Sequence, residues 1–143
     1  MNIGQLIASR DPAAIITCDA DARLGEALDC LATRRIGALP VMQGDRVAGI
    51  LSERDIIYRL RDEGADCLVR PVGEVMTAPA ITVERATRVD EALNLMTKRR
   101  IRHLPVVEGG AMLGFVSIGD LVKSQIDEVL RDAAAMRQYI TTA

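Results

Sequence analysis

The chain has 143 residues, the size of one compact domain or of two small halves that share a core. Apolar residues make up 49% of it and the net charge is −2. It therefore has material for a core but lacks the basic surface that DNA or RNA backbones require. Three aromatic residues are too few to stack several bases, and no apolar run reaches the roughly 20 residues of a membrane span.

Cysteine usage and the amino-terminal sequence bear on the compartment. Cys18, Cys30 and Cys67 are odd in number and show no CxxC spacing, which indicates free thiols in a reducing compartment. The opening Met-Asn-Ile-Gly-Gln lacks the basic-then-apolar order of a signal peptide. We therefore expect a cytoplasmic protein with no metal site that binds neither nucleic acid nor a membrane.

The first half of the chain has the spacings of a β-α-β-β-α unit preceded by a short helix. The predicted elements are a helix at Ile3–Ile7, a strand at Ala14–Cys18, a helix from Leu24 to Leu31 with Asp21 as N-cap, strands at Ala38–Met42 and Val47–Leu51 around a Gly44-Asp45 turn, and a helix that Ser52 opens and that fades near Gly64.

The second half repeats this order after a connector at Cys67–Pro79. The predicted elements are a helical turn at Val72–Met76, a strand at Ala80–Val83, a helix at Val89–Lys98, strands at His103–Val107 and Met112–Val116 around Gly109-Gly110, and a helix from Ser117 onward.

The two halves are copies of one another. Aligning Ile16–Ile57 on Ile81–Val122 needs no gap and gives 16 identities over 42 positions, where unrelated stretches share roughly 3. One unit of about 50 residues buries too little apolar surface to fold alone. We predict an α/β (α+β) fold in which two repeats pack about a pseudo-twofold axis and leave two clefts. The predicted segments are 1–66 (first helix and first repeat), 67–130 (connector and second repeat) and 131–143 (extension of the last helix).

The last helix carries an apolar stripe that outruns its counterpart in the first repeat. The stripe recurs at spacings of 4, 3, 4, 3 and 4 residues, the pattern of a coiled-coil seam: Val122, Ile126, Val129, Ala133, Met136 and Ile140. It could cover the body of its own domain or pair with the same helix of a second subunit. Its length favours a homodimer to which this helix contributes.

A glycine, a serine and an aspartate recur at identical spacing in both repeats, as Gly49-x-x-Ser52-x-x-Asp55 and as Gly114-x-x-Ser117-x-x-Asp120. One interpretation is a capping box at the start of each helix. The other is a ligand site, in which the carboxylate accepts both hydroxyls of a ribose and the helix start meets a sugar or phosphate oxygen. Repetition beside a glycine at the seam favours the ligand site.

Basic residues lead into the second predicted strand of each repeat, and they differ between the repeats. Arg34 and Arg35 precede the first such strand, where solvated helix ends explain them equally well. Arg102 and His103 of the second repeat replace Gly37 and Ala38 of the first. We therefore expect one cleft to bind phosphate well and the other weakly or not at all.

The doubled motifs, together with the two Leu-Pro-Val strands, resemble a CBS-domain pair (Bateman module), and most closely the stand-alone bacterial proteins with two CBS domains. The resemblance covers about Ile3 to Leu130. It implies an adenosine-containing ligand in the clefts: AMP, ADP, ATP, NAD(H) or S-adenosylmethionine. The implied contacts are ribose at Asp55, Asp120, Ser52 and Ser117; phosphate at Arg102, His103 and Arg100; and adenine at Ile16, Thr17, Cys18, Ile81, Thr82 and Val83.

Four functions remain to be weighed. The favoured one is a non-catalytic regulatory module that binds an adenine nucleotide and signals to a regulated protein not encoded in this chain. No nucleophile–base pair, metal cluster or Walker-type loop is visible in the sequence, so an enzyme is disfavoured. A structural dimerisation adaptor with vestigial clefts is the main alternative, and a thiol switch at Cys67 is a remote one.

Overall fold

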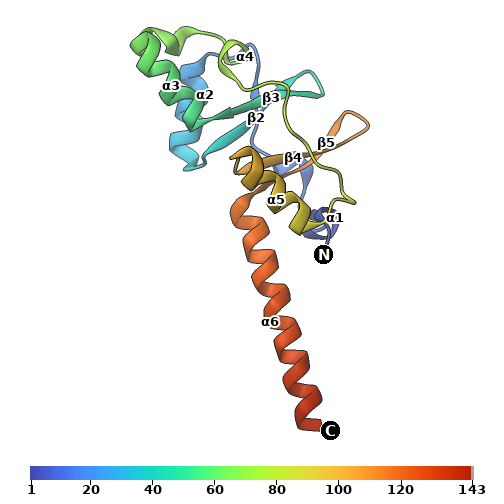
Figure 1. Ribbon diagram of the computed structural model, residues 1–143. Helices are drawn as coiled ribbons and strands as arrows, with labels where there is room; N and C mark the ends of the chain where they lie inside the picture. The colour runs from blue at the N-terminus through green and yellow to red at the C-terminus, as the bar shows by residue number, and fades with distance from the viewer. Residues whose placement is uncertain (143) are drawn as a thin grey trace.

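The computed structural model describes residues 1–142 and shows two α/β halves from which one long helix projects (Figure 1). The first half of the chain forms α1 (Ile3–Ile7), a 3-10 turn (Pro12–Ala14), β1 (Cys18–Asp19), α2 (Leu24–Arg34), β2 (Ala38–Gln43), β3 (Arg46–Ser52) and α3 (Glu53–Glu63). The second forms a 3-10 turn (Gly64–Val69), α4 (Val72–Val75), α5 (Val89–Arg99), β4 (His103–Glu108), β5 (Ala111–Ser117) and α6 (Ile118–Thr142). The predicted fold class is confirmed; Ala143, the end of the predicted extension, lies outside the described residues.

Both repeats build the same antiparallel hairpin in the same register. Ala38 pairs with Ser52 in the β2–β3 hairpin, and His103 pairs with Ser117 in the β4–β5 hairpin. Each hairpin also has its register shift at the matching place, directly after Val41 and Val106. The predicted turns are confirmed, with glycines at positive φ where a side chain would be strained.

The predicted outer strands are shorter than expected. Ala14–Cys18 is not a strand: Pro12 sits at the start of a 3-10 turn that the Asp11 side chain caps, and β1 begins only at Cys18. Ala80–Val83 is likewise reduced to Val83, which bridges Val106 in parallel. Proline favours the first turn of a helix, and this preference overrides the apolar run that followed it.

The start of α2 also differs from the prediction. Asp21 is not its N-cap; Arg23 holds that position and makes no side-chain capping bond. The Leu24 N–H instead donates to the carbonyl oxygen of Arg70 at 2.8 Å, a residue of the connector. A neighbouring segment thus satisfies the donor that a capping side chain would otherwise take.

The two hydrophobic cores exchange their leading segments. The core of the first repeat is completed by Val72 and Val75 of α4, and that of the second by Ile3 and Ile7 of α1. The backbone contacts are equivalent: Ile3 N–H donates to the Thr87 carbonyl, as Val72 N–H donates to the Ala22 carbonyl, both at 2.8 Å. The predicted boundary at residue 66 separates the repeats in the sequence. In the structure, however, the segment before each repeat packs into the core of the other repeat.

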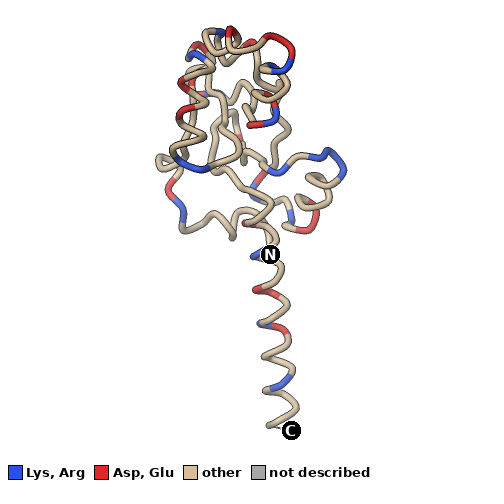
Figure 2. Tube along the Cα trace, turned by 90° about the vertical axis from the view of Figure 1, so that its left-hand side faces the viewer, with Lys and Arg blue, Asp and Glu red and all other residues tan. Residues whose placement is uncertain are grey.

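The outer part of α6 stands clear of the body, with isolated charged positions along its length (Figure 2). Its apolar stripe is exposed to solvent, from 53% at Ile126 to 71% at Ile140. Within residues 1–142 no helix combines the length and hydropathy that crossing a membrane requires.

Candidate functional site

Each Ser-x-x-Asp motif forms a capping box at the start of a helix. In the first, Ser52 N–H donates to Asp55 Oδ2 at 2.9 Å and Asp55 N–H donates to Ser52 Oγ at 3.3 Å. In the second, the corresponding distances for Ser117 and Asp120 are 2.9 and 3.2 Å. Capping therefore explains part of the motif, and the remaining oxygen capacity of each aspartate faces a hollow.

The motif glycines allow close packing of the exchanged segments. A Cβ on Gly49 would lie 2.6 Å from the Thr77 carbonyl oxygen, and one on Gly114 would lie 2.9 Å from Ile7 Cδ1. Thr77 forms two backbone hydrogen bonds with Ile50 at 2.9 and 3.0 Å, which bring it against the strand. At both glycines, therefore, the protein's own chain lies directly against the strand.

The cleft that contains Asp55 lies between the two repeats and has a volume of about 330 Å³, at the lower end of the range typical of ligand pockets. The first repeat lines it with residues between Gly37 and Tyr58, and the second with residues 99–103. Thr77 and Pro79 of the connector, and Ala80 and Ile81 directly after it, complete the lining. Its ionisable lining residues are Asp55, Arg54, Arg99, Arg100, Arg102 and His103. We call this hollow the Asp55 cleft.

The cations of the Asp55 cleft are fixed by contacts across the seam. Arg102 Nη2 pairs with Glu53 Oε1 at 3.0 Å, and Arg54 Nη1 donates to the carbonyl oxygen of Arg100 at 3.4 Å. Arg100 ends α5 in the left-handed conformation with φ 55°, as Arg35 ends α2 with φ 53°. These arginines give the cleft excess positive charge, and Ile81 is among its apolar lining residues.

His103 lies between the Asp55 cleft and a second hollow that contains Asp120. It lines both, as Ala38 does. Its ring stacks on Phe115 with 5.5 Å between centroids. Burial, and secondarily the charge of Arg102, lower the pKa of the imidazole below 6.5, so His103 is neutral at pH 7. At that pH the neutral ring can still donate or accept a hydrogen bond.

The cleft that contains Asp120 is smaller, about 250 Å³, and is mostly apolar. It adjoins a further hollow that shares Ala14, Ile15 and Phe115 with it and is lined by Arg10. Arg10 Nη2 lies 3.1 Å from Asp120 Oδ1, and Arg10 Nη1 lies 3.2 Å from Asp120 Oδ2. Burial by itself raises the pKa of Asp120, but the hydrogen bonds from Arg10 and Ser117 outweigh it and lower that pKa. We call this hollow the Asp120 cleft.

Of the six residues proposed for adenine, two line a cleft. Ile81 lines the Asp55 cleft and Ile16 lines the Asp120 cleft, so each lies opposite the aspartate of the other repeat. Four do not line either: Val83 and Cys18 pack in or against the cores, and Thr17 and Thr82 are exposed. Alternation along these extended segments turns Thr17 and Thr82 away from the ligand side. Cys18 and Val83 are instead taken up by the packing of the two cores.

The repeat pattern did not reveal three residues of the site. Thr77 donates from Oγ1 to Asp55 Oδ1 at 3.0 Å. Arg10 pairs with Asp120, and Tyr58 lines the mouth of the Asp55 cleft. Thr77 and Arg10 lie in the segments before each repeat, where the sequences no longer match. Tyr58 lies three residues after Asp55 in the same helix. That spacing puts the two side chains on one face, and it was the signal in the sequence that could have identified Tyr58.

Two findings concern metal binding and thiol chemistry. Among residues 1–142, no group of three or more His, Cys, Asp or Glu side chains is arranged to hold a metal ion. Cys67 is fully buried in the first core, and burial raises the pKa of the Cys18 thiol to about 11. Both thiols therefore lack the exposure or the acidity of a reactive cysteine.

Known proteins agree with this architecture. The family model for the CBS domain matches residues 4–62 and 72–127. The chain is 35% identical over 128 residues to the mitochondrial protein CBSX3 of Arabidopsis thaliana, covering 86% of this chain and 62% of that protein. It is 30% identical over 112 residues to YhcV of Bacillus subtilis, covering 78% and 79%. A CBS-domain protein structure from Burkholderia ambifaria superposes with a TM-score of 0.80 at 37% identity, covering 89% and 95%.

More distant structures share the fold and contain ligands. CBSX2 in complex with AMP has a TM-score of 0.74 at 22% identity, covering 88% of this chain and 96% of its own. The CBS domain pair of MJ0100 in complex with 5′-methylthioadenosine and S-adenosyl-L-methionine has a TM-score of 0.73 at 24% identity, covering 86% and 98%. Two matched repeats, one hairpin register and the shared fold lead to one conclusion: the chain belongs to the CBS-domain family and contains a pair of CBS domains.

Proposed function

We propose that this protein is a regulatory module that binds an adenosine-containing ligand (AMP, ADP, ATP or NAD(H)) between its two repeats and signals through a change of conformation or partner affinity. The observation that carries the proposal is the composition of the Asp55 cleft. A carboxylate from the first repeat and arginines from the second line one cavity of about 330 Å³.

The cleft offers a complementary group to each part of a nucleotide. Ile50, Pro79 and Ile81 supply an apolar wall for a base. Asp55 already accepts hydrogen bonds from Ser52 and Thr77, and a carboxylate with about four acceptor positions keeps capacity for a ribose hydroxyl. Arg100, Arg102 and Arg54 supply the cations that phosphate requires.

Binding would be transmitted through the contacts that cross the seam. A phosphate near Arg102 competes with Glu53, its present partner at 3.0 Å. An effector shifts an equilibrium only by its difference in affinity between two states, and breaking this cross-repeat pair supplies such a difference. The complexes of CBSX2 and MJ0100 support the ligand class. The regulated protein is not encoded in this chain.

Calorimetry with AMP, ATP, NADH and S-adenosylmethionine tests the proposal. We expect one of these to bind the wild type, and Asp55→Ala to weaken that binding by at least about tenfold, since a hydrogen bond to a charged group contributes about 1.5–3 kcal/mol. The matched control is Asp45→Ala, in the exposed β2–β3 turn outside the cleft. Absence of heat and of thermal stabilisation with all four ligands would contradict the proposal.

We also propose that two copies associate through α6, which would serve either the regulatory module or the alternative function, a structural dimerisation adaptor. The exposed stripe places the β-branched residues Ile126 and Ile140 at a positions of the heptad, which favours a parallel coiled coil of two helices. In that register Asp132 of one copy faces Arg137 of the other, as opposite charges at flanking positions.

Light scattering tests the association. We expect the wild type to be a dimer and Ile126→Asp to be a monomer, because the substitution places a charge in the seam. Gln138→Asp changes an outward position of the same helix and serves as the control. A wild-type monomer, or a dimer that survives Ile126→Asp, would contradict the role of α6.

The free thiols Cys18, Cys30 and Cys67 support a cytoplasmic location for the module.

A further inference from the structure

The two clefts are not equally accessible, because one motif aspartate is already bound by a cation. The Arg10 guanidinium reaches both carboxylate oxygens of Asp120, at 3.1 and 3.2 Å. Asp120 Oδ2 also accepts the Ser117 N–H at 2.9 Å. The oxygens that would receive a ribose diol in this cleft are therefore occupied by the protein itself.

In the part of the chain that the structure describes, no cation pairs with the aspartate of the first cleft, Asp55. Asp55 Oδ1 accepts a single hydrogen bond from the Thr77 hydroxyl at 3.0 Å. A hydroxyl is neutral and rotates about its C–O bond, so it can turn aside for a ligand hydroxyl or donate alongside it. A guanidinium that forms one charge-assisted hydrogen bond and a second ion-pair contact with the carboxylate must be displaced completely before the same oxygens are free.

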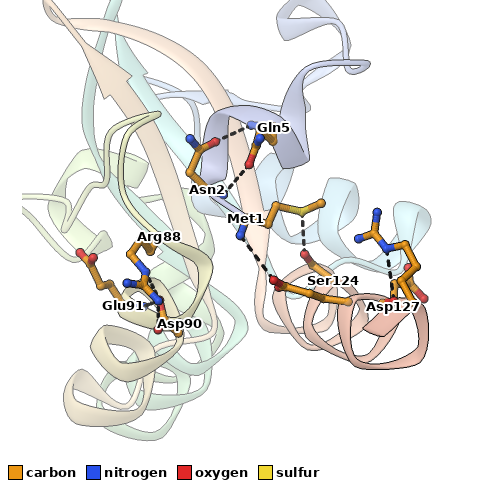
Figure 3. A network of polar contacts seen from close by, with 10 residues as sticks. Met1, Asn2, Gln5, Arg88, Asp90, Glu91, Ser124 and Asp127 are labelled. Atoms are coloured by element: carbon orange, nitrogen blue, oxygen red, sulfur yellow. Dashed lines mark hydrogen bonds and ion pairs between the residues drawn. The ribbon is translucent and has the colours of Figure 1, made fainter. Parts of the chain in front are cut away.

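The position of Arg10 is fixed by the amino-terminal segment. Asn2 and Gln5 form a capping box at α1, and Ser124 Oγ of α6 donates to Met1 Sδ at 3.0 Å (Figure 3). The Gly4 N–H donates to the Arg85 carbonyl oxygen at 2.9 Å, and the Arg10 N–H donates to that of Ile7 at 2.9 Å. These bonds hold α1 against the second repeat and direct the following residues to Asp120.

Within residues 1–142, Arg10 is also the one lysine or arginine side chain that lines the Asp120 cleft or the hollow adjoining it. The Asp55 cleft is lined by four arginines. We infer that Arg10 is the specificity-determining residue of the Asp120 cleft, excluding an uncharged adenosine from it while the Asp55 cleft stays open. This inference rests on the proposed function, and it adds that adenosine fills one cleft per chain.

The charge of the ligand decides how it competes with Arg10. An uncharged nucleoside offers Arg10 no replacement for the carboxylate that it takes away. A nucleotide offers a phosphate to the released guanidinium, which recovers part of the lost interaction. Exclusion is therefore strongest for adenosine, which makes it the sharper probe of this cleft.

Calorimetric titration with adenosine tests the inference. We expect one site per chain in the wild type and two in Arg10→Met, which keeps an unbranched side chain but removes the guanidinium. The second site should be at least about tenfold weaker in the wild type, because adenosine must break the charge-assisted hydrogen bond and ion pair between Arg10 and Asp120 there. Adding Asp120→Asn to Arg10→Met should remove the gained site, because the restored acceptor is then lost.

The control is Arg85→Met, which removes an exposed ion pair with Glu108 of 2.6 Å outside both clefts. It should leave one site. Two sites of equal affinity in the wild type, or one site in Arg10→Met, would overturn the inference and leave the proposed function standing. Absence of adenosine binding in every variant would overturn the inference, and it would overturn the proposed function as well only if AMP, ATP, NADH and S-adenosylmethionine also failed to bind. Circular dichroism of each variant verifies that the fold is kept.

Discussion

The two repeats share a hairpin register residue for residue, yet the clefts beside them differ in charge. His103 and Ser117 pair as Ala38 and Ser52 do, and both aspartates close a capping box. The differences lie in side chains, at positions where the two backbones match. Arg102 and His103 stand where the first repeat has Gly37 and Ala38, and Ile118 and Gly119 stand where it has Glu53 and Arg54. Duplication fixed the backbone, and substitution at a few seam positions gave each cleft its own chemistry.

The motif glycines provide the largest expected contrast between the repeats. In Gly49→Ala the new Cβ would meet the Thr77 carbonyl oxygen at 2.6 Å, a backbone atom held by two hydrogen bonds. In Gly114→Ala it would meet the end of the Ile7 side chain at 2.9 Å, which can change rotamer. We expect losses in unfolding free energy of about 3 kcal/mol for the first and about 1 kcal/mol for the second.

Urea denaturation of both variants measures this contrast. Equal losses would indicate that the segment at Thr77 adjusts as easily as a side chain. The relation between the exchanged segments and their glycines would then be looser than the structure implies.

The two arginines that end α2 and α5 sharpen the comparison of charge. Arg35 and Arg100 both adopt the left-handed conformation, with φ 53° and 55°. Replacing either by glycine relieves about 1–2 kcal/mol of conformational penalty, partly offset by the entropy of the unfolded glycine. We expect each variant to gain about 0.5 kcal/mol in unfolding free energy.

Only Arg100→Gly should also change ligand binding, because Arg100 lines the Asp55 cleft whereas Arg35 does not. We expect its AMP affinity to fall about tenfold, the effect of one lost charge-assisted hydrogen bond. Calorimetry and thermal melting of the pair separate the two effects. A similar affinity loss in Arg35→Gly would show that the αL turn, and not the charge, supports binding.

The sequence predicted much of the fold because the repeat shows each feature twice. The hairpins and the capping serines follow from residues that recur 65 positions apart, and the unequal seam positions are the places where that recurrence fails. Thr77 and Arg10 could not be predicted in this way. They lie in the segments that exchange cores, and which core such a segment joins depends on tertiary packing, not on local periodicity. Asp21 failed as an N-cap for the same reason, since the Arg70 carbonyl takes the Leu24 N–H.

The smallest expected contrast comes from the titration of His103, whose counterpart Ala38 does not titrate. Burial and Arg102 lower the pKa of His103 in the folded protein, while Asp120 and Glu53 oppose this shift. Because the unfolded chain binds the proton more tightly, unfolding free energy should be constant above pH 6.5 and fall as the pH drops through 6.5 toward the folded pKa.

We expect this fall between pH 7 and 5 to be below about 1 kcal/mol for the half-buried ring, and to vanish in His103→Gln. Urea denaturation at a series of pH values measures the difference between the two proteins. Subtracting the profile of His103→Gln from that of the wild type leaves the contribution of the imidazole and of its interactions with its neighbours. A wild-type profile that rises toward pH 5 would mean that the acidic neighbours outweigh burial and Arg102. The wall between the clefts would then carry positive charge even without a ligand.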